Sequence, residues 1–423
     1  MSRYRINGGR RLSGRVTISG SKNAALGVLA AAMAVDGPSV IENVPRVSDI
    51  DILLDIFALL GAKVEWQSHD TVRIDPTTVS NHEAMMEEVH QLRGSYYLLG
   101  AFLGRFGRVR QLLPGGCDFG SRPIDLHLKG FAALGASEQQ ISDGVIDLQC
   151  PQRLKGASIF LNVVSVGATI NIMLAAVHAE GVTVIDNAAK EPHIVDVANF
   201  LNAMGAEVRG AGTDVIKITG RPVLPANKTY AIIPDQIEAG TFMMMAPLTR
   251  GDITVENLIP THMEPLSNKL IDMGCLVEEG DDSIRVALME HDKLTATTFR
   301  TMPYPGYPTD LQPQTVALLC AAEGSGRVIE NVWENRFQYI DDLKLMGANI
   351  MTSGRLAIIQ GGLRLQGAKV PCRDLRAGAA MVMAALAAEG ETIVEGIETI
   401  QRGYENFVPK LRGLGAEIEE IEA

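Results

Sequence analysis

A unit of about 70 residues recurs six times along the chain, and this repeat constrains the fold more than any other feature. In each copy an apolar, alanine-rich helix leads into a short strand, often ending in Glu-Asn or Asp-Asn, and an amphipathic helix follows. This second helix usually closes with Gly-Ala, and the closing glycines are Gly61, Gly135, Gly205, Gly274, Gly347 and Gly415. Glycine at this place predicts a left-handed backbone just past each helix end, with a strand after it.

Six units of this size favour two globular halves of three units each, because common solenoid repeats are shorter, at roughly 20–50 residues. The proline-punctuated stretch 220–235 is the natural joint. The alanine-rich helices have little polar surface, so we expect them inside and the sheets outside, which inverts the usual barrel. The predicted fold is α/β, with two inside-out α/β barrels built from 22–230 and from 1–21 with 231–423. Ligands are expected in the cleft between the halves.

The composition argues against several classes of protein. No apolar run reaches the ~20 residues of a membrane span, and the basic start of the chain lacks the apolar segment of a signal peptide. The five cysteines are scattered and odd in number, which argues against disulfides or thiolate zinc and favours a reducing cytoplasm. A net charge of −12 argues against nucleic acid or an anionic membrane as partner. A small anionic ligand would need a local cationic pocket.

The stretch LLPGGCDFGSRPIDLHLKG (112–130) places Cys117 on a loop. The Pro-Gly-Gly before the cysteine breaks any regular element, and Arg122 and Lys129 would favour the reactive thiolate. Taken alone, such a loop cysteine is more often without a task. The role of Cys117 therefore has to be inferred from motifs elsewhere in the sequence.

Several distinctive motifs follow one another as they do in the enolpyruvyl transferases, and the chain resembles that family over its whole length. The motifs are SGSKNAAL (19–26), RGSYYLLG (93–100), the cysteine stretch, SVGATINIML (165–174), YPTDLQPQ (307–314), ENRF (334–337), DLRAGAA (374–380) and RGYENF (402–407). The resemblance implies two domains of three units each. It also implies addition to phosphoenolpyruvate followed by elimination, with no metal and no cofactor.

The cysteine loop bears on which acceptor the resemblance implies. The branch of the family that uses shikimate phosphate lacks this loop. Cys117 therefore favours transfer of the enolpyruvyl group to the 3-hydroxyl of UDP-N-acetylglucosamine with release of phosphate, the first committed step of peptidoglycan synthesis. A shikimate-phosphate enzyme and a non-catalytic sensor of sugar nucleotides are the alternatives. Phosphate release with each acceptor separates the two enzymes, and a sensor would lack a proton donor.

The resemblance also implies roles for individual residues. Cys117 should deliver the proton to the enol carbon and should itself form an adduct with phosphoenolpyruvate. Asp310 should accept or orient the proton of the sugar hydroxyl, and Asp374 should stand near the reacting centre. Lys22 and Arg402 should hold the phosphate and carboxylate of phosphoenolpyruvate, because basic side chains suit both groups. These five are the expected catalytic residues.

The expected substrate contacts are spread over most of the motifs. They are Lys22, Asn23, Arg93, Arg122, Pro123, Ile124, Asp125, Leu126, Ser165, Val166, Asp310, Val332, Arg376 and Arg402. The run 122–126 should cradle the uridine and diphosphate, with Arg122 also reaching phosphoenolpyruvate, and Val332 should contact the sugar nucleotide through its main chain. Without the resemblance, the default interpretations would be a turn at Asp310 and either a helix cap or an ion pair with Arg376 at Asp374.

Overall fold

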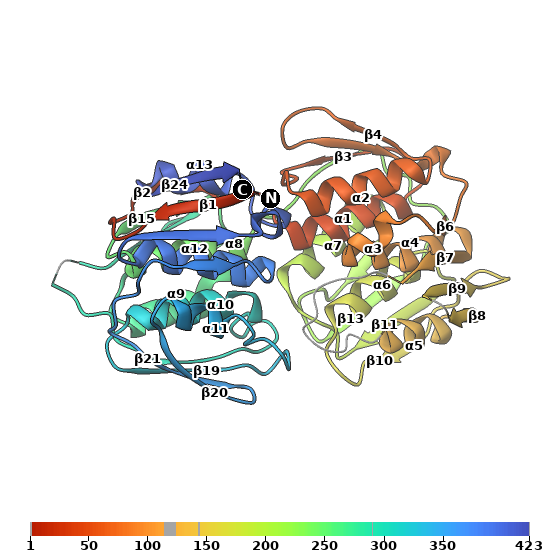
Figure 1. The fold of residues 1–423 in the computed structure, drawn as a ribbon. Helices are drawn as coiled ribbons and strands as arrows, with labels where there is room; N and C mark the ends of the chain where they lie inside the picture. The colour runs from red at the N-terminus through yellow and green to blue at the C-terminus, as the bar shows by residue number, and fades with distance from the viewer. Residues whose placement is uncertain (1, 114–123, 143, 290, 423) are drawn as a thin grey trace. The chain divides into compact units, whose positions relative to one another are not determined.

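The computed structural model describes residues 2–113, 124–142, 144–289 and 291–422, whose helices and strands are labelled in Figure 1. The chain forms two compact units. The described residues of the first unit are 20–113, 124–142 and 144–233, and those of the second are 2–19, 234–289 and 291–422. The chain therefore begins in the second unit, leaves it after Ser19 and returns to it at Pro234.

Three largely buried helices form the interior of the first unit, and three amphipathic helices each bury one face. The inner helices are α1 (Lys22–Ala34), α4 (Tyr97–Phe106) and α6 (Val166–Ala176). The outer helices are α2 (Ser48–Leu59), α5 (Asp125–Ala133) and α7 (Pro192–Ala203). Shorter helices are η1 (Pro76–Thr78), α3 (Glu88–Gln91) and η2 (Arg93–Tyr96).

Each copy of the repeat in the first unit contributes to its own four-stranded sheet. One sheet has the order β14 (Thr229–Ala231), β3 (Ser39–Glu42), β5 (Val72–Asp75), β4 (Lys63–Trp66). The next is β6 (Glu83–Ala84), β7 (Arg108–Leu112), β9 (Val145–Gln149), β8 (Ser137–Ser142). The third is β10 (Ser158–Phe160), β11 (Val182–Asp186), β13 (Val215–Thr219), β12 (Glu207–Arg209).

The second unit repeats this plan. Its inner helices are α8 (Gln236–Leu248), α10 (Gln312–Ala321) and α12 (Leu375–Ala387), and its outer helices are α9 (Pro260–Asp272), α11 (Ile340–Leu345) and α13 (Phe407–Gly413). Two short helices, η3 (Thr309–Leu311) and η4 (Ile397–Arg402), carry expected site residues.

The sheets of the second unit take in the N-terminal strands β1 (Ser2–Asn7) and β2 (Ser13–Thr17). One sheet has the order β16 (Leu276–Glu279), β17 (Ser283–Ala287), β15 (Asp252–Glu256), β2. The next is β18 (Thr298–Arg300), β19 (Ser325–Ile329), β21 (Leu356–Gln360), β20 (Asn349–Ser353). The third is β22 (Lys369–Pro371), β23 (Glu391–Glu395), β1, β24 (Glu417–Glu422). The arrangement of inner helices and outer sheets is confirmed, but the described strands form separate sheets and not one closed barrel.

The predicted turn at the end of each outer helix is confirmed. The six closing glycines have φ angles between 89° and 99°. Asparagines after the first strands of three copies, Asn43, Asn187 and Asn257, also have positive φ. Each donates from its side-chain amide to the carbonyl oxygen just past the neighbouring parallel strand, at 2.7–2.8 Å. The recurring Glu-Asn and Asp-Asn pairs therefore end a strand and fasten it to its neighbour.

Close approach of the inner helices explains why the interior is built from small side chains. At Gly100 of α4, an added Cβ would lie 2.2 Å from the backbone oxygen of Asn171 on α6. At Gly104, one helical turn further on, it would lie 3.0 Å from the oxygen of Leu174. Larger residues at these positions would force the helices apart, which fits a chain that is only 5% aromatic.

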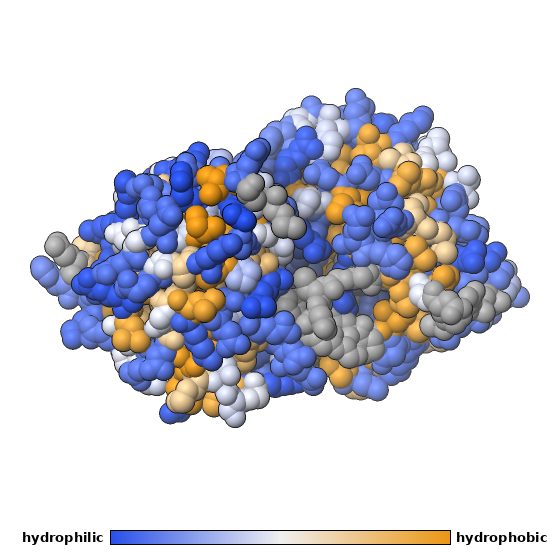
Figure 2. All heavy atoms as spheres, in the orientation of Figure 1, coloured by the Kyte–Doolittle hydropathy of each residue, from blue (hydrophilic) through white to orange (hydrophobic). Residues whose placement is uncertain are grey.

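Hydrophilic side chains cover most of the face seen in Figure 2. Over the described part of the chain, no helix is long and apolar enough to cross a membrane.

Candidate active site

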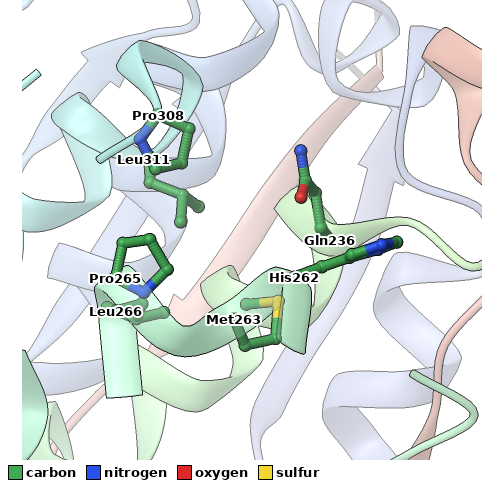
Figure 3. A pocket seen from close by; sticks show the side chains of 7 residues that line it. All are labelled: Gln236, His262, Met263, Pro265, Leu266, Pro308 and Leu311. Atoms are coloured by element: carbon green, nitrogen blue, oxygen red, sulfur yellow. The ribbon is translucent and has the colours of Figure 1, made fainter. Parts of the chain in front are cut away.

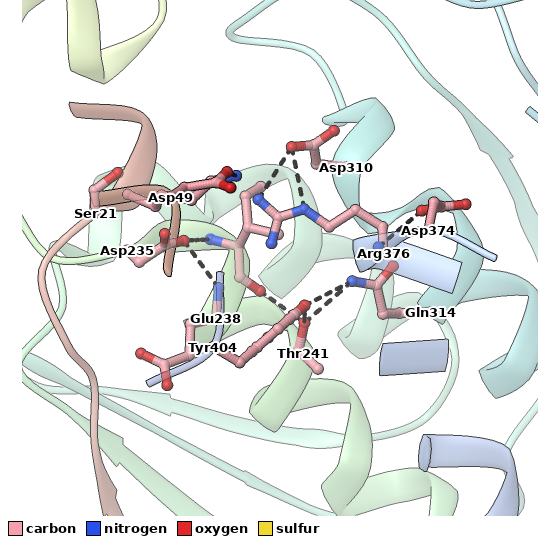
Figure 4. A network of polar contacts seen from close by, with 12 residues as sticks. Ser21, Asp49, Asp235, Glu238, Thr241, Asp310, Gln314, Asp374, Arg376 and Tyr404 are labelled. Atoms are coloured by element: carbon pink, nitrogen blue, oxygen red, sulfur yellow. Dashed lines mark hydrogen bonds and ion pairs between the residues drawn. The ribbon is translucent and has the colours of Figure 1, made fainter. Parts of the chain in front are cut away.

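Two buried arginines hold Asp310 in the second unit, and Figure 4 shows one of them, Arg376. Asp310 lies on η3, and its Oδ1 is 3.3 Å from Nη2 of Arg336. Its Oδ2 is 3.2 Å from Nη2 and 3.3 Å from Nε of Arg376. The arginine side chains are 2% and 5% exposed, whereas the aspartate side chain is 29% exposed. The carboxylate therefore lies at the edge of a buried cationic pair and remains accessible.

Burial by itself would lower the pKa of the Arg376 guanidinium. The carboxylate of Asp310, with contacts to Tyr404, outweighs burial and raises that pKa above its usual range. Arg376 is therefore a permanent cation in this site, and Asp310 is the counter-charge that makes its burial tolerable.

Asp374 fixes the backbone of Arg376. It is the N-cap of α12, and its Oδ1 accepts hydrogen bonds from the backbone N–H groups of Arg376, at 2.8 Å, and Ala377, at 3.0 Å. The default interpretation of Asp374 as a helix cap thus describes its local role. The same bond explains how this residue, only 8% exposed, is tied to the Asp310 site.

Glu330, which the sequence did not single out, organises the loops on both sides of Asp310. This carboxylate is 1% exposed and accepts from the hydroxyl groups of Thr301, at 2.8 Å, and Thr309, at 2.9 Å. It also accepts from the backbone N–H of Val332 at 2.8 Å. Since the N–H of Val332 is engaged, the expected main-chain contact of Val332 with a sugar nucleotide would use its carbonyl oxygen.

Arg336 of the ENRF motif was not among the expected substrate contacts, and the structure pairs it directly with Asp310. Glu334 of the same motif pairs with Arg355 at 3.1 Å on the exposed surface. Arg402 lies at the end of η4 and is partly exposed.

Lys22 and Asn23 begin α1 in the first unit, directly after the N-cap Ser21. Nζ of Lys22 lies 3.0 Å from Oδ2 of Asp49, and the two side chains are 11% and 3% exposed. Asp49 had not been predicted, because a helix residue 27 positions away offers no signal in the sequence. This pair brings a nearly buried cation to a helix N-terminus, where anions are favoured.

Other expected contacts of the first unit also lie at helix starts. Arg93 begins η2, and its guanidinium lies 5.9 Å from the ring centroid of Tyr96. Ile124 precedes α5, whose first turn contains Asp125 and Leu126, and Ser165 caps α6, which begins at Val166. The predictions for Cys117, Arg122 and Pro123 lie outside the described residues.

His127 is structural in the first unit. It is 6% exposed, its Nδ1 is 2.9 Å from the side-chain nitrogen of Asn171, and burial lowers its pKa to about 4. Burial is the larger cause of this shift, and the charge of Arg93 adds to it. The neutral ring therefore accepts a hydrogen bond from the Asn171 amide.

A small pocket lies beside the Asp310 loop in the second unit (Figure 3). It is lined by Gln236, His262, Met263, Pro265, Leu266, Pro308 and Leu311. Its volume is about 10 Å³, which is enough for roughly one water molecule and not for a sugar or phosphoenolpyruvate. Among the residues that the structure describes, no three His, Cys, Asp or Glu side chains are grouped to hold a metal ion.

Known proteins of similar sequence identify the family of this chain. The family model of EPSP synthase (3-phosphoshikimate 1-carboxyvinyltransferase) matches residues 6–411, so the chain belongs to this family of enolpyruvyl transferases. Within it, the chain is similar to UDP-N-acetylglucosamine 1-carboxyvinyltransferase 3 of Caldanaerobacter subterraneus subsp. tengcongensis, with 52% identity. A UDP-N-acetylglucosamine 1-carboxyvinyltransferase of Halothermothrix orenii is 49% identical. Both similarities cover 100% of this chain and of the relative.

Solved structures of the family have the same fold. The enolpyruvyl transferase NikO from Streptomyces tendae matches with a TM-score of 0.90 and 27% identity, over 100% of this chain and 99% of that one. EPSP synthase from Acinetobacter baumannii matches over 100% of both chains with a TM-score of 0.79 and 21% identity, a likeness of fold alone.

Proposed function

We propose that this protein transfers the enolpyruvyl group of phosphoenolpyruvate to the 3-hydroxyl of UDP-N-acetylglucosamine and releases phosphate. The observation that carries the proposal is the full-length identity of about half with relatives named for this transfer. The reaction is the first committed step of peptidoglycan synthesis, and we place it in the cytoplasm.

The reaction proceeds by addition and elimination. The sugar oxygen bonds to C2 of phosphoenolpyruvate and its proton passes by way of Asp310 to the phosphate, while C3 takes a proton from the thiol of Cys117, which becomes a thiolate. The tetrahedral product then returns a proton from C3 to this thiolate, the C2–C3 double bond forms again, and the bond between C2 and the phosphate oxygen breaks. Phosphate leaves with the electron pair of that bond, so atoms and charges balance.

Asp310 handles the sugar hydroxyl in this scheme. The nearby Arg336 and Arg376 stabilise its negative charge, which favours orienting the hydroxyl and sharing its proton over holding that proton outright. Its side chain is 29% exposed, so a substrate can reach it. Asp374 supports this geometry through the backbone of Arg376.

The cations bind the anionic substrates. Lys22, Arg122 and Arg402 hold the phosphate and carboxylate of phosphoenolpyruvate, and Asn23 hydrogen-bonds beside them. Bound carboxylate or phosphate would compete with Asp49 for the ammonium group of Lys22. Arg93, the run 122–126, Ser165, Val166, Val332 and Arg376 contact the substrates around this centre.

A phosphate-release assay tests the proposal. The purified protein with phosphoenolpyruvate should release phosphate when UDP-N-acetylglucosamine is added and not when shikimate 3-phosphate is added. The opposite preference would identify the shikimate-phosphate enzyme. Binding of the sugar nucleotide without release of phosphate would identify a sensor.

A matched pair of variants sharpens the assay. Asp310→Asn should lower turnover at least about a hundredfold, the usual size of a lost acid–base group. Asp341→Asn should leave turnover unchanged, because the Asp341 side chain is 80% exposed and pairs only with Lys344 among the ion pairs that the structure describes. Equal turnover in the two variants would contradict the role of Asp310.

A further inference from the structure

The copy of the repeat that contains β19 departs from the plan of other copies at the end of this strand. Three other copies place an asparagine with positive φ just past the corresponding strand, and these residues are Asn43, Asn187 and Asn257. Where β10 pairs with β11, the N–H of Leu161 donates to the backbone oxygen of the residue before Asn187. Where β18 pairs with β19, the N–H of Thr301 donates in the same way to the residue before Glu330. Glu330 therefore occupies the place of the asparagine.

The next residue, Asn331, takes over the bond that the asparagine makes in the other copies. Its side-chain amide donates to the carbonyl oxygen of Thr301 at 3.1 Å, as that of Asn187 does to Leu161 at 2.7 Å. This copy thus keeps the fastening between its strands and adds a carboxylate, Glu330, that is only 1% exposed. A departure from the local plan that buries a charged group is typical of a functional site.

Four donors converge on the Glu330 carboxylate. Its Oε1 accepts from the hydroxyl of Thr301 at 2.8 Å and from the backbone N–H groups of Val332, at 2.8 Å, and Trp333, at 3.1 Å. Its Oε2 accepts from the hydroxyl of Thr309 at 2.9 Å. Hydrogen bonds to an ionised acceptor are stronger than those between neutral groups, so the carboxylate fixes the 309 and 332–333 segments relative to each other.

These two segments contain residues that we assign to the sugar nucleotide. Thr309 begins η3 and directly precedes Asp310, and Val332 contributes its carbonyl oxygen. Arg336 and Arg376 hold the carboxylate end of Asp310. The bond from Thr309 to Glu330 instead holds the chain one residue before Asp310, so it restrains the backbone from which the aspartate side chain extends.

We propose that Glu330 is a positioning residue, which ties the loop of Asp310 to the loop of Val332 so that both meet one sugar nucleotide at a fixed spacing. The inference rests on the proposed function, because that function assigns Asp310 and Val332 to the sugar nucleotide. Loss of the Thr309 bond leaves both arginines in the site and frees the start of η3 to shift. Asp310 then orients the sugar hydroxyl less well, and small misplacements of a reacting group lower the rate.

Thr309→Val tests the inference by steady-state kinetics, because valine keeps the shape of threonine and lacks its hydroxyl. The variant should lower kcat about tenfold, which corresponds to about 1.4 kcal/mol. KM for UDP-N-acetylglucosamine should change less than about twofold, since Val332 keeps its own bond to Glu330. Thr309→Ser, which has the hydroxyl, should restore kcat to within about threefold of the unmodified protein. An unchanged kcat in the valine variant, or an equal loss in the serine variant, would overturn the inference.

A second pair of variants tests the carboxylate itself. Glu330→Gln can keep all four bonds, because its amide oxygen can replace Oε1 and its amide nitrogen can donate to the Thr309 hydroxyl, which also accepts. Glu330→Leu loses all four bonds, so kcat should fall at least about tenfold and KM for UDP-N-acetylglucosamine should rise. Glu330→Gln should keep kcat within about threefold. A loss in Glu330→Gln as large as in Glu330→Leu would overturn the inference, and if the leucine variant does not fold, the Thr309 variants still decide.

Thr249 provides a matched control for Thr309. Both side chains are partly buried, and the Thr249 hydroxyl donates within its own helix region to the backbone oxygen of Met245 at 2.8 Å. Thr249→Val should therefore leave kcat unchanged. In an Asp310→Asn background, Thr309→Val should alter kcat less than about twofold, because the group that it positions is already lost. Equal values of kcat in Thr249→Val and Thr309→Val, or the same tenfold loss in both backgrounds, would contradict the positioning role.

A crystal structure of Thr309→Val separates this inference from the proposed function. We expect the separation of Asp310 Oδ2 and Arg376 Nη2 to increase from 3.2 Å as η3 shifts. An unchanged separation would overturn the positioning role, whatever the activity. Absence of phosphate release by the unmodified protein would instead overturn the proposed function, and the crystal structure would still decide the role of Glu330.

Discussion

Lys410→Met removes the cation from a buried ion pair of the second unit. Nζ of Lys410 lies 2.6 Å from Oε1 of Glu238 and 2.7 Å from Oγ of Ser19, and the two charged side chains are 15% and 2% exposed. The other oxygen of Glu238 accepts the backbone N–H of Ser19 at 2.8 Å. Methionine fills a similar volume without charge, so the variant leaves the Glu238 carboxylate buried without its cation.

The expected loss of stability is about 3–5 kcal/mol near pH 8, the usual effect of removing one partner of a buried pair. Burial already raises the pKa of Glu238, and Lys410 opposes that rise. Without Lys410 the pKa rises further, and the neutral form costs less to bury. The deficit should therefore be largest above the new pKa of Glu238 and shrink as pH falls through it. Each unit of that pKa rise corresponds to about 1.4 kcal/mol.

Urea unfolding followed by circular dichroism at pH 5 and pH 8 measures both quantities. Lys293→Met is the control, because it breaks a 3.0 Å pair with Glu323 whose side chains are 73% and 54% exposed. That change should shift stability by about 0.5 kcal/mol or less at either pH. A loss in Lys410→Met no larger than in the control, or a loss of the same size at both pH values, would refute the reasoning.

Three further predictions concern the reaction and the acid stability of the first unit. An alkylating reagent should label Cys117 faster than Cys320, because burial raises the pKa of Cys320 to about 12. Cys117→Asp should keep turnover, whereas Cys117→Ser should lose most of it. Faster labelling of Cys320 or a fully active serine variant would contradict this prediction. Arg402→Ala should raise KM for phosphoenolpyruvate about tenfold or more. Arg10→Ala is the control and should leave KM unchanged, because it breaks an exposed ion pair with Glu417. Equal KM values in the two variants would contradict the role of Arg402 in binding phosphoenolpyruvate. Burial holds the pKa of His127 near 4, so between about pH 6.5 and 4 the unfolded chain binds a proton that the folded unit does not bind. The free energy of unfolding should therefore fall by up to about 1.4 kcal/mol per pH unit as pH is lowered through this range. His127→Gln should reduce this dependence in urea titrations, and an unchanged slope of unfolding free energy against pH would contradict the prediction.

Features that depend only on residues close together in the sequence were predictable from the sequence alone. The closing glycines mark left-handed turns because only glycine adopts such φ angles without strain, and Gly61 and Gly415 have φ of 99° and 96°. The alanine-rich helices were recognisable as buried because they have no polar face. The six-fold repeat then implied two units of three copies.

The sequence motifs also contained most of the Asp310 site without revealing its arrangement. Asp310, Asp374 and Arg376 stood in motifs of the family, and the cap formed by Asp374 follows from its place two residues before Arg376. Tyr404 stood in the RGYENF motif, but nothing there predicted that its buried hydroxyl would hydrogen-bond residues of two other helices. Its partners Thr241 and Gln314 are 163 and 90 residues away.

Only the tertiary structure decided which charges meet. Asp310 pairs with Arg376 across 66 residues and with Arg336 across 26, and Lys22 pairs with Asp49 across 27. Such pairs depend on how the inner helices and their preceding loops pack, since a few ångströms decide whether two charges interact strongly or hardly at all. The sequence determines the helices and turns through local conformational preferences, whereas distances between side chains on different elements exist only once the buried helices have packed together.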